Sequence, residues 1–260
     1  MPIDNVMTDV ELRAELAERE QQLAVLRAEL ARRDDEAAAR ASQLERYAAD
    51  LRETFKQERS RSDELKRSYR ATVRALANAV EARVAYTGRH AERVAGYGLE
   101  IAAAAGIDIA ESPEMEFGFL LHDVGKVAVP DAILFKTTTL SDEEYALIRQ
   151  HPLTGWEILR DIDFLGPAKL VVRHHHERWD GRGYPDGLKG EAIPLAARVF
   201  SVADTLDALT TDRPYRPASP FAEARAIIRR VSGTQFDPGV VHAFEAVPDE
   251  RFRELRERMG

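Results

Sequence analysis

Four of the seven histidines in this 260-residue chain stand directly beside another histidine or an acidic residue. The histidines occupy positions 90, 122, 151, 174, 175, 176 and 242. His122 precedes Asp123 at the end of an apolar segment, and His175-His176 lead into an acidic, glycine-rich segment. When a helix ends at an adjacent His and Asp, both side chains can reach one metal ion or bridge two, and other helices of a bundle supply further ligands. The pattern therefore indicates a metal site.

A single His-Asp pair is weak support for such a site, because a capping aspartate beside a hydrogen-bonded histidine is more common. Here the pair is followed, in order, by His151-Pro152, by His175-His176-Glu177 and by Asp204 with Asp207. Chance assembly of that ordered series is very improbable. Because the chain contains no cysteine, any metal must bind to nitrogen and oxygen ligands.

The composition narrows the class of protein. Hydrophobic residues make up 44% of the chain and aromatic residues only 7%, which suits packed helices better than a β-sandwich. The net charge of −8 argues against binding of a nucleic-acid polymer through a basic surface. No stretch approaches the roughly 18 apolar residues of a membrane span, and the N-terminus lacks a signal-peptide pattern. We therefore expect a cytoplasmic protein without membrane contact.

Residues 1–70 are expected to form a helical coiled-coil extension. The segment from about residue 10 to 70 contains no Gly or Pro. One seven-residue seam carries Leu16, Leu23, Leu30, Leu44, Leu51 and Leu65, and a second seam mixes Leu12, Leu26 and Tyr47 with arginines. A sustained heptad of this kind is typical of a coiled coil, since the stripe can be buried only against a second helix. The sequence thus favours a parallel homodimer through the N-terminal helices, with a single solvated helix as the alternative.

Residues 71–260 are expected to form an all-α domain of at least seven shorter helices. Three pairs carry helix-start signals: Ser112-Pro113, Ser141 with Glu144, and Ser219-Pro220. Strand-like alternation is scarce, so the predicted fold class is all-α: a long N-terminal helix followed by a multi-helix domain.

Four motifs carry a resemblance to a known family. They are HDVGK (122–126), HHERWDGRGYPDGL (175–188), IPLAARVFSVADTLDALTTDRPYR (193–216) and FDP (236–238). The chain resembles the HD-GYP family, a branch of the HD phosphohydrolases whose members hydrolyse the bacterial second messenger cyclic di-GMP. The resemblance covers roughly residues 75–245 and nothing in residues 1–70.

The resemblance implies a cluster of two divalent metal ions, iron or manganese. The matching ligand positions are His90, His122, Asp123, His151, His175, His176 and Asp204. Some members carry an acidic residue four positions before the first metal histidine, and that residue supports a third metal. This chain has Tyr86 there, and tyrosine is a poor ligand at neutral pH because its pKa is about 10. Two metals are therefore expected.

The resemblance also implies catalytic roles. Asp123 would bridge both ions, and a hydroxide held between the metals would attack phosphorus in line with the leaving oxygen. Lys126 would pair with a non-bridging phosphate oxygen, and Asp207 would orient Lys126 or a metal-bound water. Arg213 and Arg216 match substrate-phosphate positions of the family.

Tyr184 belongs to the segment DGRGYPDGLKG (180–190), which has four glycines in eleven residues. That composition alone also fits an inert surface loop. Within the resemblance, Tyr184 packs against or bonds to the wall of the site and contacts substrate. Signalling partners of the family are thought to contact this loop, so a protein-interaction role competes with a catalytic one.

The function expected from these features is metal-dependent hydrolysis of cyclic di-GMP to pGpG, with GMP as the product of a second cleavage. Two alternatives stay open. One is a signalling scaffold that binds nucleotide or protein with little or no turnover. The other is a phosphodiesterase for a different cyclic dinucleotide, because base-reading residues cannot be chosen from the sequence.

Overall fold

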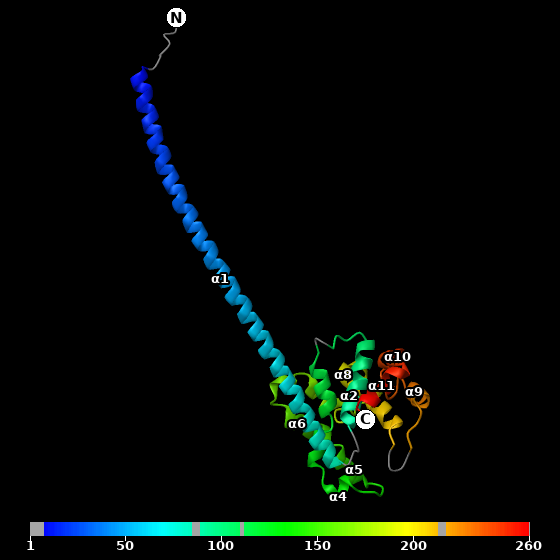
Figure 1. The fold of residues 1–260 in the computed structure, drawn as a ribbon. Coiled ribbons are helices and arrows are strands. Elements are labelled where there is room, and N and C mark those ends of the chain that lie inside the picture. Colours follow the sequence, from blue (N-terminus) through cyan, green and yellow to red (C-terminus); the bar gives the residue numbers. More distant parts are fainter. Residues whose placement is uncertain (1–7, 85–88, 110–111, 213–216, 260) are drawn as a thin grey trace. The chain divides into compact units, whose positions relative to one another are not determined.

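The structure is a computed structural model that describes residues 8–84, 89–109, 112–212 and 217–259 (Figure 1). Its contacts divide the chain into two compact units, Met1–Lys66 and Arg67–Gly260. Within the described residues there is no β-strand; the pairing of Ser232 with Phe236 is an isolated bridge. The predicted all-α fold class is confirmed. No described helix is both long and apolar enough to cross a membrane.

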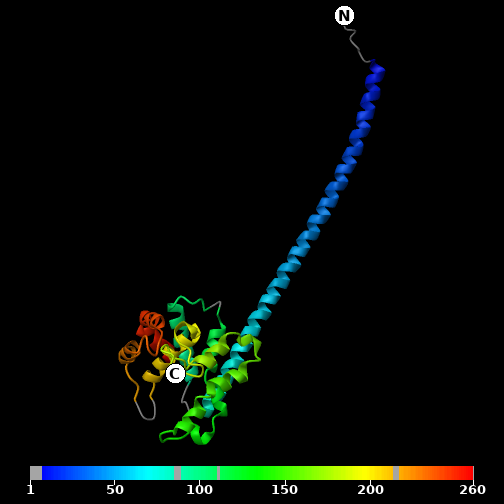
Figure 2. The same ribbon diagram turned by 180° about the vertical axis from the view of Figure 1, so that it is seen from behind.

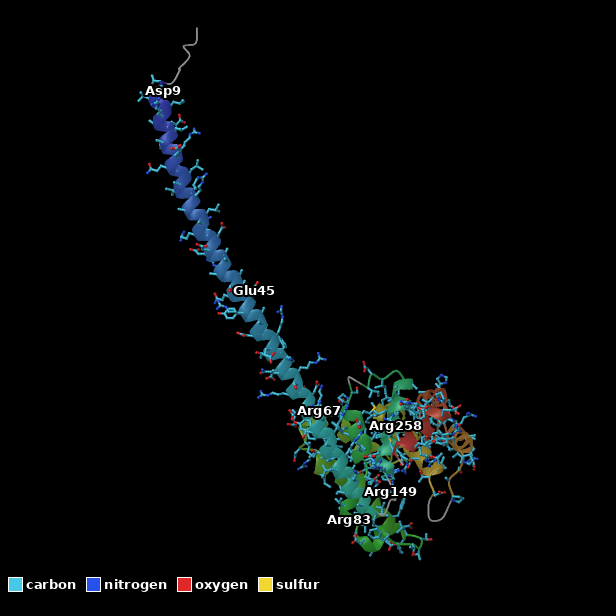
Figure 3. All side chains as sticks on the ribbon, viewed as in Figure 1. Asp9, Glu45, Arg67, Arg83, Arg149 and Arg258 are labelled. Atoms are coloured by element: carbon cyan, nitrogen blue, oxygen red, sulfur yellow. The ribbon has the colours of Figure 1, made fainter. Side chains whose placement is uncertain are left out.

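Helix α1 runs from Asp9 to Val84, a length of 76 residues. The absence of Gly and Pro allows this length, and ion pairs between glutamate and an arginine four residues later support it, as in Glu15–Arg19 at 2.7 Å. The side chains of the first unit project from all sides of the helix (Figure 3). The leucines of the predicted seam are 51–67% exposed in the single chain. An apolar stripe along this helix is therefore open to solvent, and the coiled coil remains a prediction.

Ten further α-helices follow in the described part of the second unit, in agreement with the prediction of at least seven. They are α2 (His90–Ala104), α3 (Glu114–Leu121), α4 (Asp131–Leu134), α5 (Asp142–Ile148), α6 (His151–Leu159), α7 (Ala168–His174), α8 (Leu195–Thr210), α9 (Phe221–Arg230), α10 (Pro238–Ala246) and α11 (Asp249–Met259). Three short 3₁₀ helices connect them: η1 (Val124–Ala128), η2 (Asp163–Leu165) and η3 (Gly190–Ala192).

Helices α2 and α8 pack against each other at the centre of the second unit. Val94 and Ile101 of α2 and Leu206 of α8 are fully buried in this core. Helix α3 packs between α2 and α7, and α6 packs on α7 and η1. Helices α9, α10 and α11 gather together on one side of the unit, as both views show (Figures 1 and 2). The central pair thus provides a rigid base for residues at the ends of the surrounding helices.

Helix starts agree with the sequence signals in one case of three. Ser141 accepts a hydrogen bond from the backbone of Glu144, whose side chain accepts from Ser141 in return, so the predicted capping box at α5 is confirmed. At α3 and α9 the residue in the capping position is the proline itself, and neither helix has a side-chain cap. The expectation that Ser112 and Ser219 cap these helices was wrong by one residue, because each helix starts after its proline.

Candidate metal centre

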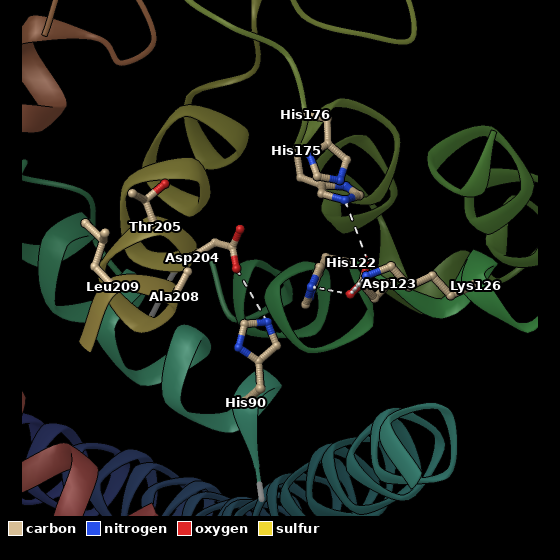
Figure 4. Close-up of a pocket in the computed structure, with 10 residues that line it drawn as sticks. All are labelled: His90, His122, Asp123, Lys126, His175, His176, Asp204, Thr205, Ala208 and Leu209. Carbon is tan, nitrogen blue, oxygen red and sulfur yellow. Dashed lines mark hydrogen bonds and ion pairs between the residues drawn. The ribbon is translucent and has the colours of Figure 1, made fainter. Parts of the chain in front are cut away.

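Six of the seven predicted metal ligands line one cavity of about 500 Å³ in the second unit (Figure 4). The seventh, His151, does not line it but lies 3.3 Å from Asp123. His90 is the first residue of α2, and His151 is the first residue of α6. His122-Asp123 follow α3, His175-His176 follow α7, and Asp204 lies within α8. Most of these side chains therefore sit at helix ends, where the backbone turns and side chains from different helices can meet.

The ligand atoms form two groups, each compact enough to hold a metal ion. One group is His151, His175 and His176, and the other is His90, His122 and Asp204; within each group the ligand atoms lie within 4.8 Å of one another. In the second group the Nε2 atom of His90 is 3.4 Å from Oδ1 of Asp204.

Asp123 lies between the two groups, and its two carboxylate oxygens face different partners. Oδ2 is 3.1 Å from Nε2 of His122, whereas Oδ1 is 3.3 Å from Nε2 of His151 and 4.0 Å from Nε2 of His175. Figure 4 shows His175 and His176 directed at Asp123 from one side and His122 beside it. A carboxylate in this position can serve both groups at once.

Three of the histidines are held in one tautomer by the same local contact. Nδ1 of His122, His151 and His175 lies 2.6–2.9 Å from the carbonyl oxygen three residues earlier in the chain. A carbonyl can only accept, so Nδ1 must carry the proton and donate it. Nε2 of each ring is then bare and faces the centre, which is the form in which histidine binds metals.

Two of these bare nitrogens confront each other. Nε2 of His151 and Nε2 of His175 are 3.1 Å apart, with no proton available from either ring to join them. Burial lowers the pKa of His151 to about 4 and holds that of His175 well below its ordinary value, so neither ring binds a second proton at neutral pH. The lone pairs of these two nitrogens repel each other, and a cation bound beside them would remove that repulsion. The donor set of imidazole nitrogens and carboxylate oxygens fits a divalent metal such as iron or manganese.

The charge of Asp123 is maintained by its neighbours. Burial would raise the pKa of this carboxyl, but His122 and Lys126 outweigh burial and hold its pKa well below the ordinary value. The Lys126 ammonium donates to Oδ2 of Asp123 over 2.6 Å. Lys126 also lines the cavity. An anionic carboxylate and a cation are therefore present together beside the two groups.

Asp207 contacts different residues from those expected. It is buried, and its Oδ2 accepts a hydrogen bond from Nδ1 of His90 at 2.7 Å. Its Oδ1 accepts from Nε of Arg93, also at 2.7 Å. The expectation was that Asp207 orients Lys126 or a metal-bound water; the contacts of the carboxylate are with His90 and Arg93 of α2, and the role towards a water stays a prediction. Asp207 instead fixes the ring of His90.

The contacts among His90, Asp207 and Arg93 also shift the pKa values of His90 and Asp207. Burial alone would lower the pKa of His90, but the hydrogen bond to Asp207 and the nearby carboxylates raise it. Burial would raise the pKa of Asp207, but its contacts with His90 and Arg93 lower it. Asp207 therefore stays ionised, and it increases the basicity of His90 as a ligand.

The comparison with protein families agrees with this geometry. A sequence profile of the HD domain family matches residues 74–240, which is more than half of the chain. The chain belongs to the HD domain family. Together with the relatives described next, this match confirms the resemblance to its HD-GYP branch.

Several curated relatives are similar to the HD domain of this chain. A cyclic di-GMP phosphodiesterase of Vibrio cholerae serotype O1 is 48% identical over 139 residues, which cover 51% of this chain and 28% of the relative. The 3'3'-cGAMP-specific phosphodiesterase 2 of the same organism is 38% identical over 180 residues, which cover 68% and 34%. The chain spans less than half the length of the curated relatives that it matches.

A solved structure shares the fold. The crystal structure of the cyclic GMP-AMP-specific phosphodiesterase V-cGAP3 from V. cholerae gives a TM-score of 0.51 at 20% identity, covering 71% of this chain and 53% of that chain. At this identity the likeness concerns the fold alone.

Tyr184 of the HD domain lies against the ligand group that contains His176. Its ring stacks on His176 with 4.7 Å between ring centroids and an angle of 24° between the planes. Glu177 accepts hydrogen bonds from the backbone N–H groups of Asp186 and Leu188, which ties the loop down. A Cβ atom on Gly183 would come within 2.4 Å of the backbone N of Arg178, so only glycine allows this close approach. The loop therefore forms part of the wall of the site.

Three residues of the sequence analysis lie outside the described residues. They are Arg213, Arg216 and Tyr86. Their assigned roles at the phosphate and in the metal count therefore stay predictions.

Some residues of the site had no sequence signal. Arg93 contacts Asp207 across 114 positions of the chain. Phe200 packs against the rings of His122 and His175. His174 is buried, and its Nδ1 lies 3.5 Å from a carboxylate oxygen of Asp186. The contacts of Arg93 and Phe200 join distant segments, so no local motif reveals them.

Proposed function

We propose that this chain is a metal-dependent phosphodiesterase that hydrolyses cyclic di-GMP to linear pGpG, with GMP formed when a second bond is cleaved. The observation that carries the proposal is the position of Asp123 between two groups of metal-ligating side chains. The relatives named as cyclic di-GMP phosphodiesterases support the choice of substrate.

Two divalent cations, iron or manganese, would be bound by the two groups. The ligands are His90, His122 and Asp204 in one group, His151, His175 and His176 in the other, and Asp123 between them. When bound, the metals would supply Lewis-acid activation of water and neutralisation of phosphate charge. Elemental analysis of protein loaded with Mn(II) should find two ions per chain. Three ions per chain would contradict the argument from Tyr86.

The residues of the chain have separate tasks in this proposal. Lys126, which lies beside Asp123, supplies a positive charge to a phosphate oxygen. Asp207 holds His90 in the orientation of a ligand. Tyr184 contacts substrate from its position on His176, and Arg213 and Arg216 bind substrate phosphate.

The test is to incubate metal-loaded protein with cyclic di-GMP and to identify the products by chromatography. We expect linear pGpG to appear with Mn(II) or Fe(II). Absence of turnover with both metals would contradict the proposal and favour a scaffold that binds nucleotide without hydrolysis.

A second candidate substrate is 3'3'-cGAMP, since a relative with 38% identity is named as specific for that nucleotide. The two substrates differ only in one base. Parallel measurement of kcat/KM for both separates the candidates: we expect the higher value for cyclic di-GMP, and the reverse order would reassign the substrate.

The remaining proposals concern the context of the enzyme. We place the phosphohydrolase domain at residues 71–260 and the coiled-coil extension at residues 1–70, which would join two chains as a parallel dimer in the cytoplasm. The exposed leucine seam supports the pairing. The loop around Tyr184 is also the proposed contact for a signalling protein, because several of its residues are exposed.

A further inference from the structure

A second cavity lies beside the metal centre. It has a volume of about 410 Å³ and shares His175, His176, Asp204 and Thr205 with the first cavity. Its other walls come from α5 and the residue after it, from residues 177–184, from Ser201 of α8 and from Gln235. A ligand at the metal groups could therefore extend into this cavity without crossing a barrier of protein.

The second cavity is lined by three arginines, and two of them form no ion pair with a described carboxylate. Arg149 and Arg182 line it, and neither guanidinium forms an ion pair with a described carboxylate. Arg178 also lines it, but its guanidinium is bound by Asp180 at 2.8 Å. The Glu177 carboxylate accepts backbone N–H groups. The Asp180 carboxylate interacts electrostatically with Arg182, but it forms no ion pair with that guanidinium. Two guanidinium groups that form no ion pair with a described carboxylate are suited to binding an anion with bidentate geometry, such as a phosphate.

Arg149 is held in a defined place relative to the metal ligands. Its guanidinium carbon is 4.5 Å from the centroid of the Tyr184 ring, whose neighbour in the stack is His176. Arg149 follows directly after α5, whose start is fixed by the capping box of Ser141 and Glu144. Stacking on an aromatic face leaves the N–H groups at the edge of the guanidinium available to a ligand.

We propose that Arg149 and Arg182 bind the phosphate of a cyclic dinucleotide that is not being cleaved. The inference rests on the proposed function, since it assumes that the other phosphate lies at the metal groups. A cyclic dinucleotide carries two phosphodiesters in one ring, so a site for the uncleaved phosphate must lie close to the site of cleavage. The second cavity meets that requirement, and it selects substrates with two phosphates.

The test compares two substrates in the full chain loaded with Mn(II). Cyclic di-GMP has two phosphates, whereas bis(p-nitrophenyl) phosphate has one. For Arg149→Gln combined with Arg182→Gln, we expect KM for cyclic di-GMP to rise at least about tenfold, as expected for loss of a charge-assisted hydrogen bond. Hydrolysis of bis(p-nitrophenyl) phosphate should stay within about twofold of the parent. A change of that size is well below the roughly tenfold loss expected when a charge-assisted hydrogen bond is removed. Arg149→Lys should recover part of the loss.

The matched control is Arg160→Gln, an exposed arginine at the end of α6 that lines neither cavity. It should leave both substrates unaffected. Equal losses for both substrates in the double variant would overturn the inference, because they would indicate damage to the metal centre. Unchanged KM for cyclic di-GMP would also overturn it.

A binding measurement separates this inference from the proposed function. Calorimetry of cyclic di-GMP with the Asp123→Ala variant needs no turnover. Adding Arg149→Gln and Arg182→Gln to that variant should weaken binding at least about tenfold, and unchanged binding would overturn the subsite. If the parent binds cyclic di-GMP through these arginines but does not cleave it, the proposed function fails and the subsite stands.

Discussion

At the scale of single residues, the centre depends on contacts behind the ligands. Backbone carbonyls three residues earlier hold the rings of His122, His151 and His175, so that Nε2 of each faces the cavity. His90 is instead held by a buried carboxylate, Asp207. Removal of such a partner typically lowers metal affinity by about 10–100-fold.

Asp207→Asn should therefore weaken Mn(II) binding by about 10–100-fold, measured by calorimetric titration. The neutral amide no longer stabilises His90 as a ligand, and it removes the Asp207 charge that pairs with the Arg93 guanidinium. Asp161→Asn, at an exposed aspartate on the surface, is the control and should bind Mn(II) like the parent. Unchanged affinity in Asp207→Asn would show that His90 is not a ligand or does not need this support.

Substitution of Tyr184 separates its ring from its hydroxyl. Tyr184→Phe keeps the ring that stacks on His176, so kcat/KM for cyclic di-GMP should stay close to the parent value. Tyr184→Ala removes a stacked aromatic contact of about 0.5–1.5 kcal/mol and should lower kcat/KM by about two- to tenfold. Equal losses in both variants would place the function in the hydroxyl group instead.

At the scale of elements, close contact between η1 and α6 brings Asp123 and His151 together. A Cβ atom on Gly125 would lie 1.9 Å from the carbonyl oxygen of His151 and 2.5 Å from the backbone N of Gly155. Both contacts are with backbone, which cannot rotate away. The two elements can therefore lie at this distance only because Gly125 has no side chain.

Gly125→Ala should lower the free energy of unfolding by about 1–3 kcal/mol or more, as overpacking does, when measured by urea denaturation. The added methyl group must push η1 and α6 apart. Because this separates His151 from Asp123, Mn(II) affinity should also fall. Gly190→Ala is the control: its positive φ makes alanine unfavourable, but no atom lies within 4 Å of the new Cβ. It should cost stability and leave Mn(II) affinity unchanged. Retention of parent Mn(II) affinity by Gly125→Ala would refute the link between this contact and the site.

The sequence indicated helices, and candidate ligands that the fold brings together, where the signal is local. His122-Asp123 and His175-His176 stand side by side, and the capping box of α5 spans four residues, so each could be found from the chain alone. The contacts of Asp207 with His90 and Arg93 were not predicted, and neither was the position of Arg149 in the wall of the second cavity. Arg93 is 114 residues from Asp207, and Arg149 is 35 residues from Tyr184. Only the packing of the helices brings such pairs together.

At the scale of the whole molecule, the proposed dimer depends on the exposed leucine seam of the first unit. Leu23 and Leu30 lie on the seam, and both are more than half exposed in the single chain. Burial of a leucine side chain contributes about 1.5–3 kcal/mol, so a seam of six leucines can drive pairing of two chains.

Leu23→Asp with Leu30→Asp should shift the full chain from dimer to monomer in analytical ultracentrifugation. Val25→Asp is the matched control, because Val25 is equally exposed on the same helix but lies off the seam. It should leave the dimer intact. A parent chain that sediments as a monomer at all concentrations would contradict the coiled coil.

The central claim is that Asp123 joins two metal groups in a phosphodiesterase, and one measurement tests it most directly. Protein stripped of metal with chelator is titrated with Mn(II), and hydrolysis of cyclic di-GMP is followed for the parent and for Asp123→Ala. We predict that hydrolysis by the parent appears only as Mn(II) is added. In Asp123→Ala, hydrolysis should fall by more than about a hundredfold. That loss exceeds the roughly 10–100-fold that follows when a residue that only supports a ligand is removed. Undiminished hydrolysis by Asp123→Ala, or hydrolysis by the stripped parent, would contradict the claim.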